Sequence, residues 1–388
     1  MSRRVVQVLG SSAGGVARHV AQIASALSAG GDELDGLQVQ VVGPAAVKAT
    51  VLPGTGTGTD AVAFRAVEIT DRPRPADARA VLELRRLVRE AGVLHAHGLR
   101  AGALAVLAAR TLPRGVRPRS VVTLHNLPVG GRAVRVVSGV LEIVVTRGAD
   151  VVLGVSGDLV ARAGARGARR AERALVPAPT TPPPGRSRED VRADLGVPDG
   201  AALAVTVARL APQKGLDTLL DAAGLLRAAL PLVWVVAGDG PLEPALAARV
   251  RGEDLPVRLL GRRHDVPDLL AAADVVVSTA VWEGQPIAVQ EALRVGAAVV
   301  ATDAGGTREV TGDAAVLVPV GSAERLAEAV RAVLSDDGRR EELRAAASAR
   351  SAELPDVAQV VAQLVRVYGF DAGGSDGGAR HRPPGPHR

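Results

Sequence analysis

Short apolar segments alternate with longer amphipathic segments along most of the chain. In the first half, the apolar segments are rich in Val and Leu, and apolar residues recur with the helical period between them. The first pattern is typical of buried strands, and the second of helices that cover a sheet. The two patterns together predict strands at 5–10, 37–43, 61–67, 93–97, 120–125 and 150–156, and helices at 16–29, 76–90, 99–111 and 134–147.

A proline-rich segment interrupts this alternation. Residues 176–188 contain five prolines, which can continue neither a helix nor a central strand. The alternation then restarts, so the segment is typical of a linker between domains. The second half predicts strands at 202–209, 232–238, 256–261, 274–279, 297–302 and 314–319, and helices at 215–229, 243–251, 286–295, 322–334, 338–352 and 356–368.

This order of elements predicts the fold class and the place of the site. Near-continuous apolar strands separated by helices favour parallel sheets with both faces covered. We therefore predict two Rossmann-like, doubly wound α/β domains at 1–178 and 189–355, with the linker at 179–188 and a disordered tail at 371–388. Such sheets bind ligands beyond the C-terminal ends of their strands, so the interdomain cleft is the expected site.

Composition narrows the classes of partner. The net charge is +6, but arginines are scattered among acids and aromatic residues make up only 1% of the chain. A nucleic-acid partner is therefore not expected, because stacking side chains and a concentrated basic surface are both missing. A basic face for an anionic acceptor or a membrane surface is the alternative to a merely solvated surface.

Targeting and redox signals are also absent from the sequence. The chain has no cysteine, so disulfides and thiolate metal sites are excluded. Because no secretory signal or membrane-spanning segment is recognisable, we expect a cytoplasmic protein, with peripheral contact at the inner membrane face left open. The apolar segment 132–147 has Arg at both ends; we expect a helix that faces the core, and the alternative is a helix that docks on a membrane.

Candidate anion-binding groups stand at the turns that follow strands. Gly14 and Gly15 open the first predicted helix, where free backbone amides favour an anion. Arg209 ends a strand and Lys214 precedes the next helix. A forked guanidinium and a compact ammonium suit a diphosphate, and Lys214 stands out because arginine supplies nearly every other cation. Gly305 and Gly306 offer further backbone amides at a later strand end.

Two carboxylates and two histidines complete the candidate chemistry. Glu283 precedes the helix that starts near Pro286, and Glu291 lies about one and a half turns into it. Because vicinal hydroxyls can both donate to a carboxylate, each glutamate suits one diol of an extended ligand. His97 and His125 follow neighbouring strands, so both are expected to face the cleft.

Together these motifs resemble a known family. GGV at the first turn, an H-x-H-G turn, a T-x-H-N turn, ARLAPQKG, an E-x7-E stretch and a later GG turn look like the family-4 retaining glycosyltransferases of GT-B fold. The resemblance covers residues 4 to about 370. It implies transfer of a sugar from a nucleoside-diphosphate sugar to an acceptor, with no cofactor. It also implies that the last helix, within 356–370, crosses back onto the first domain.

The resemblance implies a role for each matching residue. Arg209 and Lys214 would bind the diphosphate, Glu283 the sugar hydroxyls, Glu291 the ribose, and His125 the transferred sugar. The catalytic candidates are thus His125, Arg209, Lys214 and Glu283. The donor-binding candidates are Gly14, Gly15, Gly238, Gly284, Gln285, Pro286, Ile287, Glu291, Gly305 and Gly306, and the acceptor-side candidates are His19, His97 and Asn126.

The reaction expected from this resemblance is front-face transfer without a metal. Because no D-x-D motif is present, Arg209, Lys214 and helix N-termini are expected to stabilise the leaving diphosphate. Gln285 and Pro286 replace the family's frequent Phe-Gly, and Arg308 replaces a frequent proline, so the donor sugar is not predicted. The alternatives are a nucleotide-sugar epimerase of GT-B shape and a non-catalytic protein that binds a sugar nucleotide. The acceptor is not predicted; variable loops at 44–60 and 127–133 are expected to select it.

Overall fold

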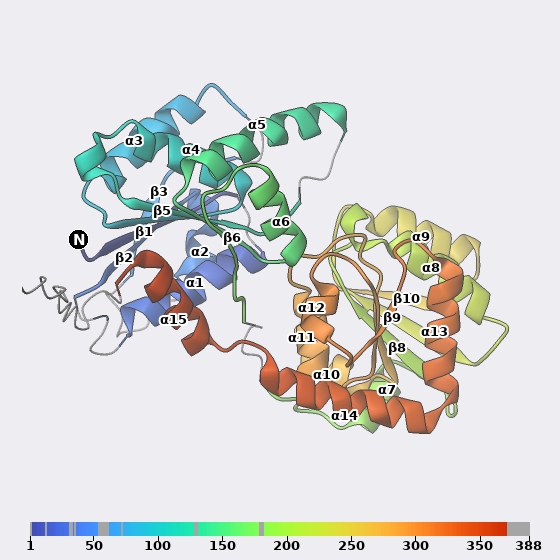
Figure 1. The fold of residues 1–388 in the computed structure, drawn as a ribbon. Coiled ribbons are helices and arrows are strands. Elements are labelled where there is room, and N and C mark those ends of the chain that lie inside the picture. Colours follow the sequence, from blue (N-terminus) through green and yellow to red (C-terminus); the bar gives the residue numbers. More distant parts are fainter. Residues whose placement is uncertain are drawn as a thin grey trace, which may run out of the picture.

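The protein folds into two α/β domains that face each other (Figure 1). The computed structural model describes residues 2–11, 14–30, 34, 36–52, 62–70, 73–127, 131–177 and 182–370. Within this part of the chain each domain has one fully parallel sheet, which confirms the predicted pair of doubly wound domains. The predicted tail 371–388 and much of the predicted acceptor loop 44–60 lie outside the described residues.

The first domain is built on a seven-stranded sheet of order β3-β2-β1-β4-β5-β6-β7. Its central strands are buried along their length because Val and Leu dominate both faces. The order reverses direction between β1 and β4, which is the switch point where such sheets bind ligands. The strands are β1 (Arg4–Leu9), β2 (Gln38–Gly43), β3 (Val62–Ala66), β4 (Val93–His97), β5 (Arg119–Leu124), β6 (Val151–Gly154) and β7 (Ala171–Arg173).

Helices cover both faces of this sheet. Figure 1 shows α3, α4 and α5 side by side on one face, and α1 on the other. The predicted helices are found within one or two residues of their expected ends. The helices are α1 (Gly15–Ser28), α2 (Lys48–Val51), α3 (Asp77–Val88), α4 (Leu99–Arg110), α5 (Arg132–Gly148) and α6 (Gly157–Ala165), with short 3-10 turns η2 (Ala45–Val47) and η3 (Arg114–Val116).

The second domain repeats the architecture with six parallel strands in the order β10-β9-β8-β11-β12-β13. Its switch point lies between β8 and β11, so the loops that follow these two strands open into the same region. The strands are β8 (Ala202–Val207), β9 (Leu232–Ala237), β10 (Val257–Gly261), β11 (Val275–Ser278), β12 (Val299–Thr302) and β13 (Val316–Val318).

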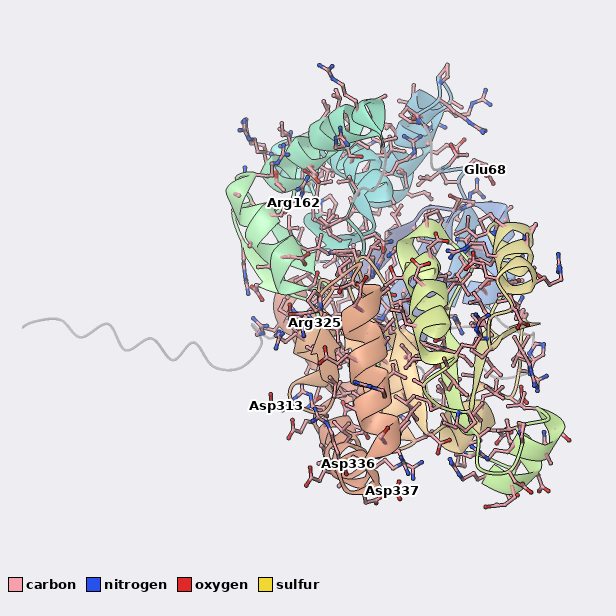
Figure 2. All side chains as sticks on the ribbon, turned by 90° about the vertical axis from the view of Figure 1, so that its right-hand side faces the viewer. Glu68, Arg162, Asp313, Arg325, Asp336 and Asp337 are labelled. Carbon is pink, nitrogen blue, oxygen red and sulfur yellow. The ribbon has the colours of Figure 1, made fainter. Side chains whose placement is uncertain are left out.

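The helices of the second domain form two layers. α8 and α13 bury leucines and valines against one face of the sheet, and α7, α10 and α11 bury theirs against the other. Figure 2 shows Asp336 and Asp337, where α13 meets α14, at the end of this domain away from the first. The elements are α7 (Arg188–Asp194), η4 (Pro212–Lys214), α8 (Leu216–Leu226), α9 (Glu243–Gly252), α10 (Val266–Ala272), α11 (Ile287–Arg294), α12 (Thr307–Thr311), α13 (Ala323–Ser335) and α14 (Asp337–Glu353).

The last described helix, α15 (Val357–Tyr368), returns to the first domain. It begins at a capping box in which the Asp356 carboxylate accepts from the Gln359 amide, and the Gln359 side chain accepts from the Asp356 amide. Its apolar face, including Val360, Leu364 and the fully buried Tyr368, joins the first domain's core. The chain therefore closes the first domain only after it has built the second.

Several elements were not predicted. The short helices α6, α7 and α10 fall in segments rich in Gly, Asp and Pro, where the periodic signal is weak. The predicted linker ends at 188, but Arg188 already starts α7 and its guanidinium donates to the carbonyls of Ala272 and Ala273. Residues 178–181 of the linker segment are outside the described part of the chain.

Candidate active site

A cavity of about 1520 Å³ lies between the domains, beyond the C-terminal ends of the strands. Most of the residues predicted from the sequence line it. From the first domain these are Gly14, Gly15, His19, His125 and Asn126. From the second they are Arg209, Lys214, Gly238, Glu283, Gly284, Gln285, Pro286, Ile287 and Glu291.

Three predicted residues are placed differently. His97 is buried behind the cavity wall and does not line it, so the expectation that it faces the cleft is corrected. Gly305 and Gly306 also lie outside the cavity lining. The Gly306 amide donates to the Glu283 carbonyl over 2.8 Å, so it holds the Glu283 loop and is not free to meet a phosphate.

Two glycines bring the cationic loop into place. Gly215, next to Lys214, has φ +59, and a Cβ there would lie 2.2 Å from the Thr279 carbonyl oxygen. Gly238 has φ +147, and its Cβ would lie 1.9 Å from the Ala208 carbonyl oxygen. The absence of a side chain at both positions lets the loops after β8, β9 and β11 come together at one edge of the sheet. The Thr279 hydroxyl stabilises this arrangement by donating a hydrogen bond of 2.8 Å to the Lys214 carbonyl oxygen.

Lys214 and Glu283 form an ion pair in the cavity. The Glu283 side chain is 12% exposed and that of Lys214 is 26% exposed, so both are partly withdrawn from water but open to the cavity. A paired ammonium and carboxylate can each turn to a ligand that offers an anion beside a hydroxyl group. The structure therefore unites two groups that the sequence assigned to adjoining parts of one ligand.

Tight packing fixes the loop that carries Glu283. A Cβ on Gly305 would lie 2.1 Å from the Glu283 carbonyl oxygen, and one on Gly306 would lie 2.1 Å from that of Gly284. On the other side, a Cβ on Gly284 would lie 2.8 Å from the His125 carbonyl oxygen in the first domain. The three glycines thus let three backbone segments from two domains meet beside the carboxylate.

The α1 and α11 helices approach each other across the cavity. A Cβ on Gly15 would lie 3.0 Å from the Ile287 methyl group of the second domain. Glu291, one turn further along α11, is half-buried; burial raises its pKa, and the charges of Arg18 and Arg294 oppose that rise. Arg18 lines the cavity from α1 and was not predicted, although it stands three residues after Gly15 in the glycine turn.

Four histidines form a continuous cluster, called the seam below, that runs from the first-domain wall of the cavity into the domain. His97 Nδ1 lies 3.3 Å from His125 Nε2, and the His95 and His97 ring centres are 4.2 Å apart. His19 completes the cluster, with its ring centre 5.7 Å from that of His125. The far end is tied to α15, because His95 Nδ1 lies 2.7 Å from the hydroxyl of Tyr368.

Burial keeps these imidazoles neutral. It lowers the pKa of His19 to about 4 and that of His95 to about 3, with the neighbouring His19 adding to the effect on His95. Burial, followed by repulsion from the other histidines, holds the pKa values of His97 and His125 well below the usual value. His125 therefore meets the cavity as an uncharged hydrogen-bonding group at neutral pH.

Polar contacts that the sequence did not suggest join the domains at the cavity edge. The Trp282 indole donates to Asp158 over 2.7 Å. Glu309 on α12 accepts from the Gly157 amide over 2.7 Å and pairs with Arg173 over 2.6 Å. Of these residues, only Trp282 stands out in the sequence, because it is one of two tryptophans and directly precedes Glu283.

Comparisons with known protein families agree with this geometry. Residues 14–179 match the model described as "Glycosyl transferase 4-like domain", and residues 187–350 match "Glycosyl transferases group 1". Both halves of the chain, and thus both sides of the cavity, are covered. The chain belongs to the group 1 glycosyltransferases.

Individual relatives of this group 1 glycosyltransferase align over part of their length. The putative teichuronic acid biosynthesis glycosyltransferase TuaC of Bacillus subtilis is 36% identical over 148 residues, or 37% of this chain and 36% of the relative. The alpha-maltose-1-phosphate synthase of Mycolicibacterium smegmatis is 31% identical over 198 residues, or 46% of this chain and 51% of the relative. The chain thus spans about half or less of these curated relatives.

A solved structure shares the GT-B fold over nearly the whole chain. The crystal structure of Anabaena Alr3699/HepE in complex with UDP superposes with a TM-score of 0.75 and 20% sequence identity. The match covers 94% of this chain and 99% of the Anabaena protein. The predicted GT-B architecture is therefore confirmed.

Two further observations concern the described residues of this group 1 glycosyltransferase. No cluster of three or more His, Asp or Glu side chains there has an arrangement that could hold a metal ion. None of the helices in that part of the chain combines the length and apolar character required to cross a bilayer.

Proposed function

We propose that this protein is a retaining glycosyltransferase that moves a sugar from a nucleoside-diphosphate sugar to an acceptor hydroxyl without a metal ion. The observation that carries the proposal is the Lys214–Glu283 ion pair, which lies in a cavity lined by both domains. The complex of the Anabaena neighbour with UDP supports a nucleotide-sugar donor.

The residues of the second-domain side would hold the donor in order along its length. Arg209 and Lys214 offer two cations to the diphosphate, which a forked guanidinium and an ammonium suit. Glu283 lies beside Lys214 and can accept from hydroxyls of the sugar. Glu291, on α11, also lines the cavity and can accept from a second diol such as that of ribose.

In the transfer step, the bond between the anomeric carbon and the diphosphate oxygen breaks, and its electron pair stays on the diphosphate. Arg209 and Lys214 stabilise the charge that develops there. The acceptor oxygen bonds to the anomeric carbon on the same face, and its proton passes to the leaving phosphate oxygen. His125, kept neutral by burial, can hydrogen-bond the transferred sugar without adding charge to the site.

The proposal is tested by assaying nucleoside-diphosphate release from UDP- and GDP-sugars with Lys214→Ala and Glu283→Ala. We expect each substitution to lower turnover by about 100-fold or more. Lys48→Ala is a matched control, since Lys48 is the only other lysine and is exposed on α2. Glu328→Ala, at an exposed position on α13, is the matched control for Glu283→Ala.

Each outcome has a distinct meaning. Full activity in both Lys214→Ala and Glu283→Ala contradicts the assignment. Conversion of the donor sugar without any acceptor would identify an epimerase, and donor binding without turnover would identify a binding protein. Retention of the anomeric configuration is checked by NMR of the product, and metal independence by turnover that survives EDTA.

A further inference from the structure

The N-terminal half of α5 lies exposed on the surface of the first domain. Every residue from 131 to 137 is exposed, although three of them are valines. The C-terminal half is different, because Glu142, Val145 and Thr146 are buried against α4 and α6. The expectation of a core-facing helix is thus met only by the C-terminal half of α5.

The exposed apolar side chains of α5 form a stripe. Val136, Val140 and Ile143 are spaced by four and three residues, so they lie on one face of the helix. Val136 is 62% exposed and Val140 is 58% exposed, and the exposed Val137 borders them. Contiguous exposed apolar side chains on one helix are unusual for a protein surface that meets only water.

The exposed charged residues of α5 itself are all positive. Arg132, Arg135 and Arg147 are exposed on α5 itself. The only acid of the helix, Glu142, is buried and paired with Arg162 and Arg166 of the α6 segment. Figure 2 shows Arg162 between α6 and the overlying α5. The exposed face of α5 therefore presents valines and arginines, and the helix contributes no exposed carboxylate of its own.

In the sequence, the helix that carries the stripe follows a residue of the cavity wall. Asn126 lines the first-domain wall of the cavity, and α5 begins shortly afterwards at Arg132. Figure 1 shows α5 along the outer edge of the first domain, with one end extended on the side of the second domain. A surface bound to α5 would therefore contact the first domain, which supplies the cavity wall that the proposed donor residues leave for an acceptor.

We propose that the α5 stripe docks this protein on a membrane surface that contains anionic lipid. Valines that enter the interface and arginines that meet anionic headgroups are the two components of such docking. An acidic, apolar groove on a partner protein would accept the same exposed helix, so sedimentation with protein-free vesicles is the observation that assigns the stripe to a membrane. If the proposed transfer holds, the acceptor hydroxyl belongs to a molecule held in that membrane.

The test is co-sedimentation with vesicles of phosphatidylcholine alone and of phosphatidylcholine mixed with phosphatidylglycerol. We expect the full chain to sediment with the mixed vesicles only. The double substitution Val136→Ser/Val140→Ser should lower the partition coefficient by about tenfold or more. Arg132→Gln should lower it about fivefold, and by less at high salt.

A matched control uses exposed apolar residues elsewhere. Leu225 on α8 and Val320 after β13 are exposed in the second domain, so Leu225→Ser/Val320→Ser should sediment like the unaltered protein. Thermal unfolding checks that each variant is folded, and the shift in that transition on adding UDP or GDP reports the donor site. All variants should keep that shift, so failure of docking is distinguishable from failure of the proposed transfer.

Several outcomes would overturn the docking proposal. One is the lack of sedimentation of the unaltered protein with the mixed vesicles at low salt. Another is equal sedimentation of Val136→Ser/Val140→Ser and the unaltered protein. A third is a concentration-dependent dimer that the double substitution abolishes, without vesicle binding, because this would assign the stripe to a second copy of the chain.

Discussion

The two walls of the cavity differ in how they handle charge. The second-domain wall keeps ionic groups, with Lys214 paired to Glu283 and Arg209 nearby. The first-domain wall has His19 and His125, which burial holds neutral. Charged side chains indicate which charges and hydroxyl groups a ligand must carry, whereas neutral histidines can hydrogen-bond many different hydroxyl-bearing ligands. This difference explains why the donor class can be proposed in detail and the acceptor only through its proposed location.

The largest effect on turnover should come from a substitution that displaces the second-domain wall, called the charged wall below. Gly215→Ala places a Cβ against the Thr279 carbonyl oxygen, so the adjacent Lys214 must shift. We expect kcat/KM for donor turnover to fall about 100-fold, because displacements of this kind misalign a reacting group. Gly200→Ala is the control: its φ is also positive, at +74, but nothing lies within 4 Å of the added Cβ. Equal activities of the two variants would contradict this role of Gly215.

The histidine wall should make stability depend on pH. The pKa of His19 is about 4 in the folded state against 6.5 ordinarily, so the unfolded chain binds more protons between these values. The stabilisation of the neutral form is complete above pH 6.5 and declines as the pH falls towards 4. For His19 alone the loss is on the order of 3 kcal/mol.

Urea unfolding between pH 7.5 and 4.5 measures this loss. His19→Gln should flatten the decline, because a group that no longer titrates removes its part of the linkage. A free energy of unfolding that stays constant over this range would show that the seam is not held neutral.

His97→Gln should sharpen the contrast between the walls. The substitution removes the imidazole whose Nδ1 lies 3.3 Å from His125 Nε2, at a residue that does not line the cavity. We expect kcat to fall about tenfold, as for one lost hydrogen bond, with the Kd for UDP or GDP unchanged. A weakened Kd with unchanged kcat would place His97 in nucleotide binding instead.

The smallest effect should come from the far end of the seam. Tyr368→Phe removes the hydroxyl 2.7 Å from His95 Nδ1 and leaves that buried nitrogen unpaired. Stability should fall by about 1–2 kcal/mol, with little change in turnover. Denaturant unfolding measures the first quantity and donor turnover the second; a large loss of turnover with unchanged stability would be the opposite of this expectation.

The sequence by itself determined the two parallel-sheet domains and most of the charged wall. Val- and Leu-rich strands alternate with periodic helices, and such patterns are local, so they can be recognised without knowledge of contacts. Arg209, Lys214, Glu283 and Glu291 were recognisable because strand-to-helix turns of such sheets open at one edge. The short helices α6 and α7 were missed because few residues carry their periodicity.

Only the tertiary structure decided which groups meet across the cavity and which are withdrawn from it. His97 lies behind His125 because α1, β4 and β5 pack around it, and the Gly306 amide is used by the Glu283 carbonyl. The N-terminal half of α5 is exposed although its sequence is rich in valine. Burial, pairing and exposure depend on neighbours distant in the chain, so a local pattern cannot specify them.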